Sequence, residues 1–188
     1  MQARRETVIL LIALGCAAAW AGPGIQPVRK TLDSATEIQG RSCAKGYAWF
    51  YDDGRLERCT VDGDTAFGEV RIPSDSIIVL DRTGNPKYAM LSRDWPILGL
   101  KCRGGGWLGP AEGATTAFYS NGQPKECWLA GDQFVQGVPC RDSFGFWNAV
   151  FGNGTGGVNF YHTGRLKSCT LSRDFAGLKR GQRFVQGP

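Results

Sequence analysis

Six cysteines in the body of the chain are the residues best suited to covalent chemistry. They are Cys43, Cys59, Cys102, Cys127, Cys140 and Cys169, and a seventh, Cys16, stands in an apolar N-terminal stretch. An even number of cysteines in an exported chain favours a disulfide framework. The sequence has no CxxC pair, the close spacing that zinc sites prefer. We therefore predict three disulfides, no metal site and no cofactor.

The other reactive side chains do not form a recognisable catalytic set. His162 is the only histidine, and no Ser or Asp can be identified as its partner, so we interpret it as a solvated turn residue. A glycoside hydrolase would need two carboxylates facing each other across a cleft. Asp142 and Asp174 are the candidates near the aromatic segments, and nothing in the sequence orients them. We predict that the protein is not an enzyme.

Four aspartates recur at one spacing, five residues after each repeated Cys or Ala position: Asp64, Asp94, Asp132 and Asp174. One interpretation is a row of carboxylates that binds Ca²⁺ along an edge. Calcium takes six to eight oxygen ligands, however, and each position offers one obvious carboxylate. We favour the other interpretation, in which each side chain accepts hydrogen bonds from backbone N–H groups at a turn.

Two glycine-rich segments with aromatic side chains are the candidate binding loops. Segment 103–117 contains Trp107, and segment 141–159 contains Phe146 and Trp147. Exposed aromatic rings among glycines could stack on sugar rings or contact a peptide or lipid. The alternative is that these segments fold back and cover a face of the sheet.

An internal repeat must position all of these residues. Clear copies at 50–61, 118–129 and 160–171 each read Phe-Tyr, two polar residues and Gly, and a degenerate copy lies at 79–91. In every copy the Gly stands five residues before a Cys or Ala. Aromatic and β-branched residues around Asp-Gly, Asn-Gly or Thr-Gly predict a β-hairpin.

A second shared piece accompanies each hairpin, at 38–43, 67–72, 97–102 and 134–140, and the chain ends on a further match at 184–187. We expect this piece to add one strand, which gives three strands a unit. The sequence thus predicts an all-β fold, an antiparallel meander of about four three-stranded hairpin repeats stapled by disulfides. The expected organisation is a linker at 22–37 and a β-repeat domain at 38–188, with units at 38–66, 67–96, 97–133 and 134–188.

The repeat also indicates how the cysteines pair. Units one, three and four each carry one Cys at the start and one on the hairpin, whereas unit two has Ile72 and Ala89 at these positions. Joint presence or absence favours bonds within a unit, namely Cys43–Cys59, Cys102–Cys127 and Cys140–Cys169. The rival scheme joins neighbouring units, as in Cys127–Cys140, and would leave two cysteines unpaired.

The first 21 residues predict export. Arg4 and Arg5 precede a short apolar run that ends in Ala19-Trp20-Ala21, the three parts of a signal peptide. Cys16 loosely fits a lipoprotein cleavage box, so a lipid anchor on Cys16 is the alternative. We expect a periplasmic or extracellular protein, with a lipid-anchored envelope location as the alternative and membrane association only if Cys16 is lipidated.

Charge narrows the class of partner. The formal net charge of +5 over 188 residues is too small to imply nucleic acid. The basic segment 179–183 could meet phosphate or lipid head groups, but we favour its acting as a charged residue cluster that protects a sheet edge from aggregation.

The Phe-Tyr-x-x-Gly-x-Leu copies at 50–61, 118–129 and 160–171 resemble MORN-type repeats, closest to a bacterial variant, over about residues 40–187. The resemblance implies single-layer stacking of hairpins and a non-catalytic role in protein or membrane contact. The paired cysteines depart from the usual cytoplasmic repeat and fit export. We expect an exported binding or scaffold module of the bacterial envelope whose partner is a protein or envelope component. The alternative is a carbohydrate- or peptidoglycan-associated protein that uses loops 103–117 and 141–159.

Overall fold

The computed structural model describes residues 27–105, 115–143 and 157–187, and every regular element in these ranges is a β-strand. Since helices do not occur there, the described ranges contain no helix long and apolar enough to cross a membrane. The predicted all-β antiparallel meander is confirmed.

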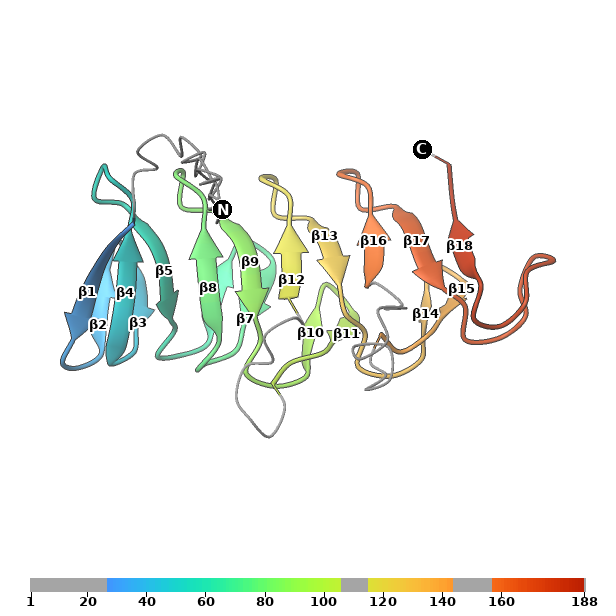
Figure 1. Ribbon diagram of the computed structural model, residues 1–188, viewed down its shortest axis with the longest axis horizontal. Helices are drawn as coiled ribbons and strands as arrows, with labels where there is room; N and C mark the ends of the chain where they lie inside the picture. Colours follow the sequence, from blue (N-terminus) through green and yellow to red (C-terminus); the bar gives the residue numbers. More distant parts are fainter. Residues whose placement is uncertain (1–26, 106–114, 144–156, 188) are drawn as a thin grey trace, which may run out of the picture.

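One long antiparallel sheet runs the length of the molecule (Figure 1). Its ten strands follow in chain order: β1 (Val28–Leu32), β4 (Gly46–Phe50), β5 (Leu56–Thr60), β8 (Ile77–Leu80), β9 (Pro86–Met90), β12 (Thr115–Phe118), β13 (Pro124–Cys127), β16 (Val158–Phe160), β17 (Leu166–Thr170) and β18 (Arg183–Val185). Four hairpins, β4–β5, β8–β9, β12–β13 and β16–β17, are the long hairpins of units one to four. Because neighbours in sequence are neighbours in the sheet, the contacts are local and each unit docks mainly on the next.

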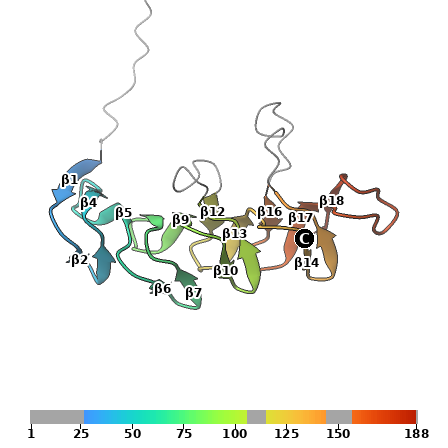
Figure 2. The same cartoon turned by 90° about the horizontal axis from the view of Figure 1, so that it is seen from below.

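Four short hairpins leave this sheet and lie along one of its faces (Figure 2). They are β2 (Thr36–Ile38) with β3 (Arg41–Cys43), β6 (Thr65–Phe67) with β7 (Val70–Ile72), β10 (Trp95–Ile97) with β11 (Leu100–Cys102), and β14 (Gln133–Val135) with β15 (Val138–Cys140). The expected single strand is therefore two strands, and a unit has four. The units begin at β2, β6, β10 and β14, one or two residues before the predicted boundaries.

Two-residue turns explain the short hairpins. In three of them the turn has positive φ at both positions, as at Gln39 (52°) and Gly40 (74°), which matches the twist of antiparallel strands. In unit two the turn places Gly68 first, with a φ of 60°. A glutamine with positive φ is uncommon, which is why the sequence reads as one continuous strand here.

The long hairpins share one turn. The N–H of Tyr51 donates to the carbonyl of Arg55 at 2.8 Å, and the N–H of Gly54 donates to the carbonyl of Tyr51 at 3.0 Å. The turn glycines have φ between 79° and 85° in all four units. In each hairpin the register shifts just beyond the turn, as between Trp49 and Phe50. The glycine positions predicted from the repeat are therefore required by the backbone.

The core lies between the two layers. The long sheet contributes side chains such as Leu56, Ile78 and Leu166, and the short hairpins contribute Ile72 and Ile97; all are at most 1% exposed. Each such side chain contributes about 1.5–3 kcal/mol on burial. The short hairpins thus form the second layer that the sequence did not predict, in contrast to the single layer implied by the MORN resemblance.

The three disulfides join the layers. Cys43 pairs with Cys59, Cys102 with Cys127 and Cys140 with Cys169, at Cα–Cα distances of 5.8, 5.8 and 5.7 Å. Each bond links the second strand of a short hairpin to the second strand of the long hairpin in the same unit. These are the pairs that the repeat alignment predicts, and all six cysteines are buried.

Unit two differs in its backbone as well as in its lack of cysteines. In unit one the N–H of Ala44, directly after Cys43, donates to the carbonyl of Thr60 at 2.8 Å. The equivalent residue of unit two is Pro73, which has no N–H. Instead, the Ser92 hydroxyl donates to the carbonyl of Ser74 at 2.6 Å. Unit two therefore joins its layers by packing and side-chain hydrogen bonds.

Tyrosines connect unit one to unit two and unit three to unit four, whereas unit two has Asp81 at the equivalent position. The hydroxyl of Tyr51 donates to the carbonyl of Leu80 at 2.6 Å, and that of Tyr119 donates to the carbonyl of Phe160 at 2.9 Å. Burial, followed by the charge of Glu57, raises the pKa of Tyr51 above its ordinary value.

Both ends of the sheet differ from the sequence-based expectation. Residues 28–32, expected within a linker, form edge strand β1 on β4; only Val28 and Leu32 are apolar, so the strand signal is weak. Residues 184–187, expected to repeat the short piece, instead include most of β18, which pairs with β17 at the opposite edge. The carbonyl of Gln186 accepts the Tyr161 hydroxyl at 2.7 Å, which replaces the contact to a following unit.

Candidate functional site

The aromatic residues and the N-terminal cysteine singled out in the sequence cannot be placed. Trp107, Phe146, Trp147 and Cys16 all lie outside the described residues. Their roles in binding and lipidation stay predictions.

The described bases of the two aromatic loops are tied together. Arg103 lies at the start of segment 103–117 and Asp142 at the start of segment 141–159, and Nη2 of Arg103 lies 2.7 and 2.9 Å from the two carboxylate oxygens of Asp142. Asp142 is therefore an ion-pair partner rather than a carboxylate facing Asp174. A hydrogen bond to a side chain fixes the same region, since the N–H of Leu129 donates to the buried Ser143 hydroxyl at 3.0 Å.

The recurring aspartates accept hydrogen bonds from backbone N–H groups, as we expected, but the donor residues are not adjacent in sequence. Asp64, Asp94 and Asp132 each accept the N–H of the residue ten positions later, at 2.9, 3.1 and 2.8 Å. Asp174 accepts the N–H of Arg180 at 2.9 Å and the Lys179 ammonium at 2.9 Å, and the latter contact chiefly lowers its pKa. No group of three or more His, Cys, Asp or Glu side chains within 27–105, 115–143 and 157–187 could hold a metal ion.

Aromatic rings on the open face of the sheet are covered by cations of the same chain. The guanidinium of Arg29 lies 4.6 Å from the centre of the Tyr47 ring, and that of Arg58 lies 3.9 Å from the Trp49 ring. Such stacks stabilise the sheet by about 0.5–1 kcal/mol each. The rings are therefore partly occupied and do not form a bare platform for sugars.

A cavity of about 510 Å³ opens between units one and two, at the edge formed by the hairpin turns. We call it the arginine groove; it is lined by Gln39, Arg41, Arg55, Leu56, Leu80, Arg82, Thr83 and Gly84. The guanidiniums come from the short hairpin of unit one, the long hairpin of unit one and the turn of unit two. None of the lining residues is acidic.

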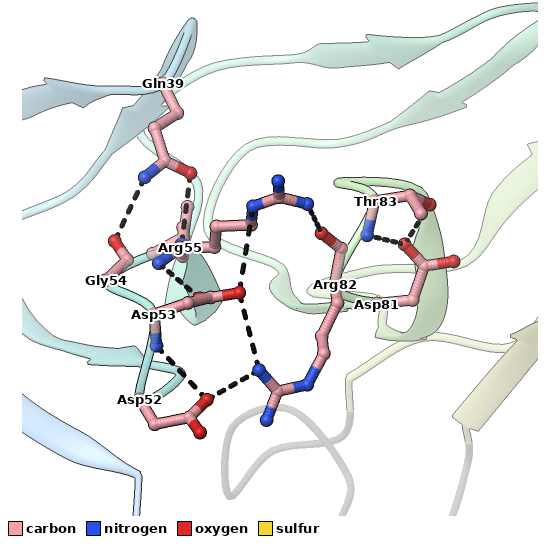
Figure 3. A network of polar contacts seen from close by, with 9 residues as sticks. Gln39, Asp52, Asp53, Gly54, Arg55, Asp81, Arg82 and Thr83 are labelled. Atoms are coloured by element: carbon pink, nitrogen blue, oxygen red, sulfur yellow. Dashed lines mark hydrogen bonds and ion pairs between the residues drawn. The ribbon is translucent and has the colours of Figure 1, made fainter.

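A polar network fixes the wall of the arginine groove (Figure 3). Nη1 of Arg82 lies 2.5 Å from Oδ1 of Asp52 and 3.4 Å from Oδ2 of Asp53. Nη1 of Arg55 donates to the carbonyl of Arg82, and Nε of Arg55 lies 3.8 Å from Asp53. The hydrogen bond from Arg82 lowers the pKa of Asp52, and the same bond raises the pKa of Arg82.

The turn of unit two is held by its own aspartate. Oδ1 of Asp81 accepts the N–H of Thr83 at 2.8 Å and that of Asn85 at 3.0 Å. Burial acts to raise the pKa of Asp81, but these hydrogen bonds and that from the Thr83 hydroxyl outweigh it, so the pKa is lowered. The Asp81 carboxylate therefore bonds within its own turn, and the neighbouring Arg82 pairs with Asp52 and Asp53 instead.

Gln39 fixes the unit-one side of the groove. Its Nε2 donates to the carbonyl of Gly54 at 3.1 Å, and its Oε1 accepts the N–H of Leu56 at 3.1 Å. Gln136 makes the same two bonds in unit four, at 2.8 and 2.9 Å. Units two and three have Pro86 and Pro124 at the Leu56 position, and neither unit has a glutamine at the turn. The glutamine thus occurs where an N–H is available to donate to it.

A second cavity, of about 300 Å³, occupies the same repeat position between units three and four. We call this cavity the apolar groove. It is lined by Leu98, Gly99, Leu100, Gln123, Pro124, Phe134, Val135, Gln136, Phe160 and Gly164. Leu98 is 39% exposed and Phe134 is 62% exposed. Leu98 presents hydrocarbon surface to solvent at a concave site, and the Phe134 ring is partly covered by the Arg173 guanidinium, 4.9 Å from its centre.

The side chains at three equivalent positions differ between the two grooves. Arg41 of unit one corresponds to Leu100 of unit three, Arg55 corresponds to Gln123, and Arg82 of unit two corresponds to His162 of unit four. His162 is exposed in its turn, as expected, and its ring packs edge-on to Tyr119 with centroids 6.5 Å apart.

Sequence reasoning missed both grooves. The signal was present in the repeat alignment, as a change of side-chain type at positions whose backbone is shared. It could not be interpreted without knowing that turns of neighbouring units meet. No protein-family model matches this chain, and no curated protein or solved structure does.

Proposed function

We propose that this protein is an exported, non-catalytic binding module of the bacterial envelope that holds its ligands at the grooves between its units. One observation carries the proposal: the same backbone cavity occurs between units one and two and between units three and four, with different linings. Variation of lining on a constant frame is typical of repeat proteins that bind through a row of similar sites. MORN-like membership would fit this role.

Export is supported by the disulfides. Three buried disulfides in one small domain are consistent with an oxidising compartment, because the cytosol keeps thiols reduced. The signal-peptide pattern at 1–21 supplies the route, and periplasm or extracellular space is the destination we propose. Mass measurement of the mature N-terminus, with palmitate labelling, distinguishes cleavage after Ala21 from lipidation of Cys16.

A binding screen tests the function. Oxidised protein 22–188 is applied to a glycan array that includes peptidoglycan fragments and to a peptide array. We expect saturable binding to one class of compound that falls about tenfold when a groove is altered, with Leu98→Gln plus Phe134→Ser as the apolar-groove variant. Lys125→Gln, at an exposed sheet position, is the control. Absence of binding on both arrays, or release of a cleaved product, would contradict the proposal.

The second candidate is a carbohydrate- or peptidoglycan-associated protein that binds through loops 103–117 and 141–159. The ion pair between Arg103 and Asp142 favours it, because that pair places the bases of both loops side by side. Trp107→Ala and Trp147→Ala variants on the same glycan array separate the two candidates. Loss of glycan signal in these variants, with the grooves intact, selects the loops.

A further inference from the structure

We propose that the arginine groove binds a small organic anion whose carboxylate or phosphate group is held by Arg41, Arg55 and Arg82. This inference rests on the proposed binding function and names the ligand class of one groove. Three arginines line this cavity, and no acidic residue is among its lining residues. Guanidinium forks match planar carboxylate and phosphate oxygens closely.

Donors remain available on all three arginines. Arg41 donates through Nη1 to the carbonyl of Ala66 at 3.4 Å, and no carboxylate within the described ranges forms an ion pair with it. The hydrogen bonds and ion pairs of Arg55 involve Nη1 and Nε, and those of Arg82 involve Nη1. The guanidinium of Arg41 also stacks on the Phe67 ring at 4.3 Å, and that of Arg82 on the Tyr51 ring at 4.7 Å. In the described part of the chain, Nη2 of each arginine is without a hydrogen bond to protein.

The shape of the groove favours an organic anion over a bare ion. A cavity of about 510 Å³ lies in the size range of small-molecule sites. Leu56 is 1% exposed and Leu80 is 3% exposed, so the floor offers almost no apolar surface and a ligand would be held mainly by the polar side chains of the walls. The bonds of Gln39 to Gly54 and Leu56 hold the wall in place before a ligand arrives, which lowers the entropic cost of binding.

The fold itself does not require these arginines. Units three and four form the equivalent groove with Leu100, Gln123 and His162 in the three positions. The same hairpin turns and the same tyrosine contact between units occur in both places. The groove therefore forms without the three arginines, and their Nη2 groups remain available for binding.

Isothermal titration calorimetry tests the inference with four probes: citrate, glucose 6-phosphate, inorganic phosphate and glucose. Oxidised protein 22–188 is titrated at low salt and at 0.5 M NaCl. We expect citrate or glucose 6-phosphate to bind at least about tenfold more tightly than inorganic phosphate, because their additional carboxylate or hydroxyl groups can contact further polar side chains of the groove. We also expect binding to weaken at high salt. Glucose shows no binding. Equal affinity for inorganic phosphate, or no heat with either organic anion, would overturn the inference.

Two variants localise the site. The triple variant Arg41→Leu, Arg55→Gln and Arg82→His installs the residues that units three and four already carry, and we expect it to lower affinity by about a hundredfold or more. Arg41→Leu alone keeps the Asp52–Arg82 pair and is expected to lower affinity by about tenfold. Arg165→Gln, at the Arg55 position of unit four, is the control and leaves affinity unchanged. Circular dichroism verifies folding of each variant.

The outcomes separate this inference from the proposed function. If the triple variant binds the organic anions as well as the parent does, the arginine groove is not their site. If the parent binds neither anion but binds a compound on the glycan or peptide array through the apolar groove, the inference fails and the binding function stands.

Discussion

Removal of the first disulfide in favour of the residues found in unit two is the most informative perturbation of the fold. Unit two has buried Ile72 and Ala89 at the two cysteine positions, both 0% exposed. The double variant Cys43→Ile and Cys59→Ala therefore keeps a side-chain combination that this scaffold already packs. The change isolates the contribution of the covalent link.

The magnitude follows from the loop that the bond closes. The two cysteines are 16 residues apart in sequence. Closing a loop of this length lowers the conformational entropy of the unfolded chain by about 10 cal/mol/K, which corresponds to about 3 kcal/mol of stability at 25 °C. Urea unfolding followed by tryptophan fluorescence should show the free energy of unfolding lowered by about this amount. Since repeat proteins can unfold unit by unit, hydrogen exchange should show the loss concentrated in units one and two.

Two results would refute this reasoning. A loss below about 1 kcal/mol would mean that the bond does not constrain the unfolded chain as the structure implies. A loss spread evenly over all four units would mean that the layers are not joined unit by unit. The parent protein with all bonds reduced serves as the lower limit.

Three further predictions concern single side chains. Tyr119→Phe should lower the free energy of unfolding by about 1 kcal/mol, because it removes the hydroxyl donated to the next unit; Tyr88→Phe, at an exposed position, should change it little, and equal effects would contradict the account. Gln136→Leu introduces the residue type found at the equivalent position of unit three, Leu98, and removes two hydrogen bonds, so it should lower the free energy of unfolding by about 1–3 kcal/mol. No measurable loss in urea unfolding would contradict the structure. Folding lowers the pKa of Asp52, so the ionised carboxylate contributes to the free energy of unfolding above its ordinary pKa of 3.8, and this contribution is lost as the pH falls through the lower folded pKa. Below pH 4 the urea midpoint of Asp52→Asn should therefore fall less steeply with pH than that of the parent. Identical pH profiles would count against the ion pair.

The sequence was sufficient for the features that each unit repeats. The glycine in each long-hairpin turn needs positive φ, so its spacing is visible in the sequence as Asp-Gly, Asn-Gly or Thr-Gly. The cysteine pairs are predictable for a different reason: unit two lacks both members together. These two signals define the meander and its three bonds without any knowledge of contacts between units.

The second layer was not predictable in the same way. Strands such as β2 and β3 have three residues each, too few to show a period-two pattern. Their turn places Gln39, a residue that rarely has positive φ, at the first position. A three-residue strand, a turn and another three-residue strand therefore read as a single strand.

The grooves form where the turns of two units meet, and contacts between units cannot be read from a pattern along the chain. Arg41 and Arg82 lie 41 positions apart in sequence and meet only because the turn of unit two docks beside unit one. Aromatic residues among glycines, such as Trp107 and Trp147, are by contrast recognisable from composition alone. The N-terminal edge strand was missed since its charged residues conceal a short apolar pattern.

Non-reducing peptide mapping of the exported protein tests the central claim most directly, namely that one module is copied four times and closes its own disulfide where it has one. The account predicts three intramolecular linked peptides, containing Cys43 with Cys59, Cys102 with Cys127, and Cys140 with Cys169. A linked peptide that joins Cys127 to Cys140 would contradict it.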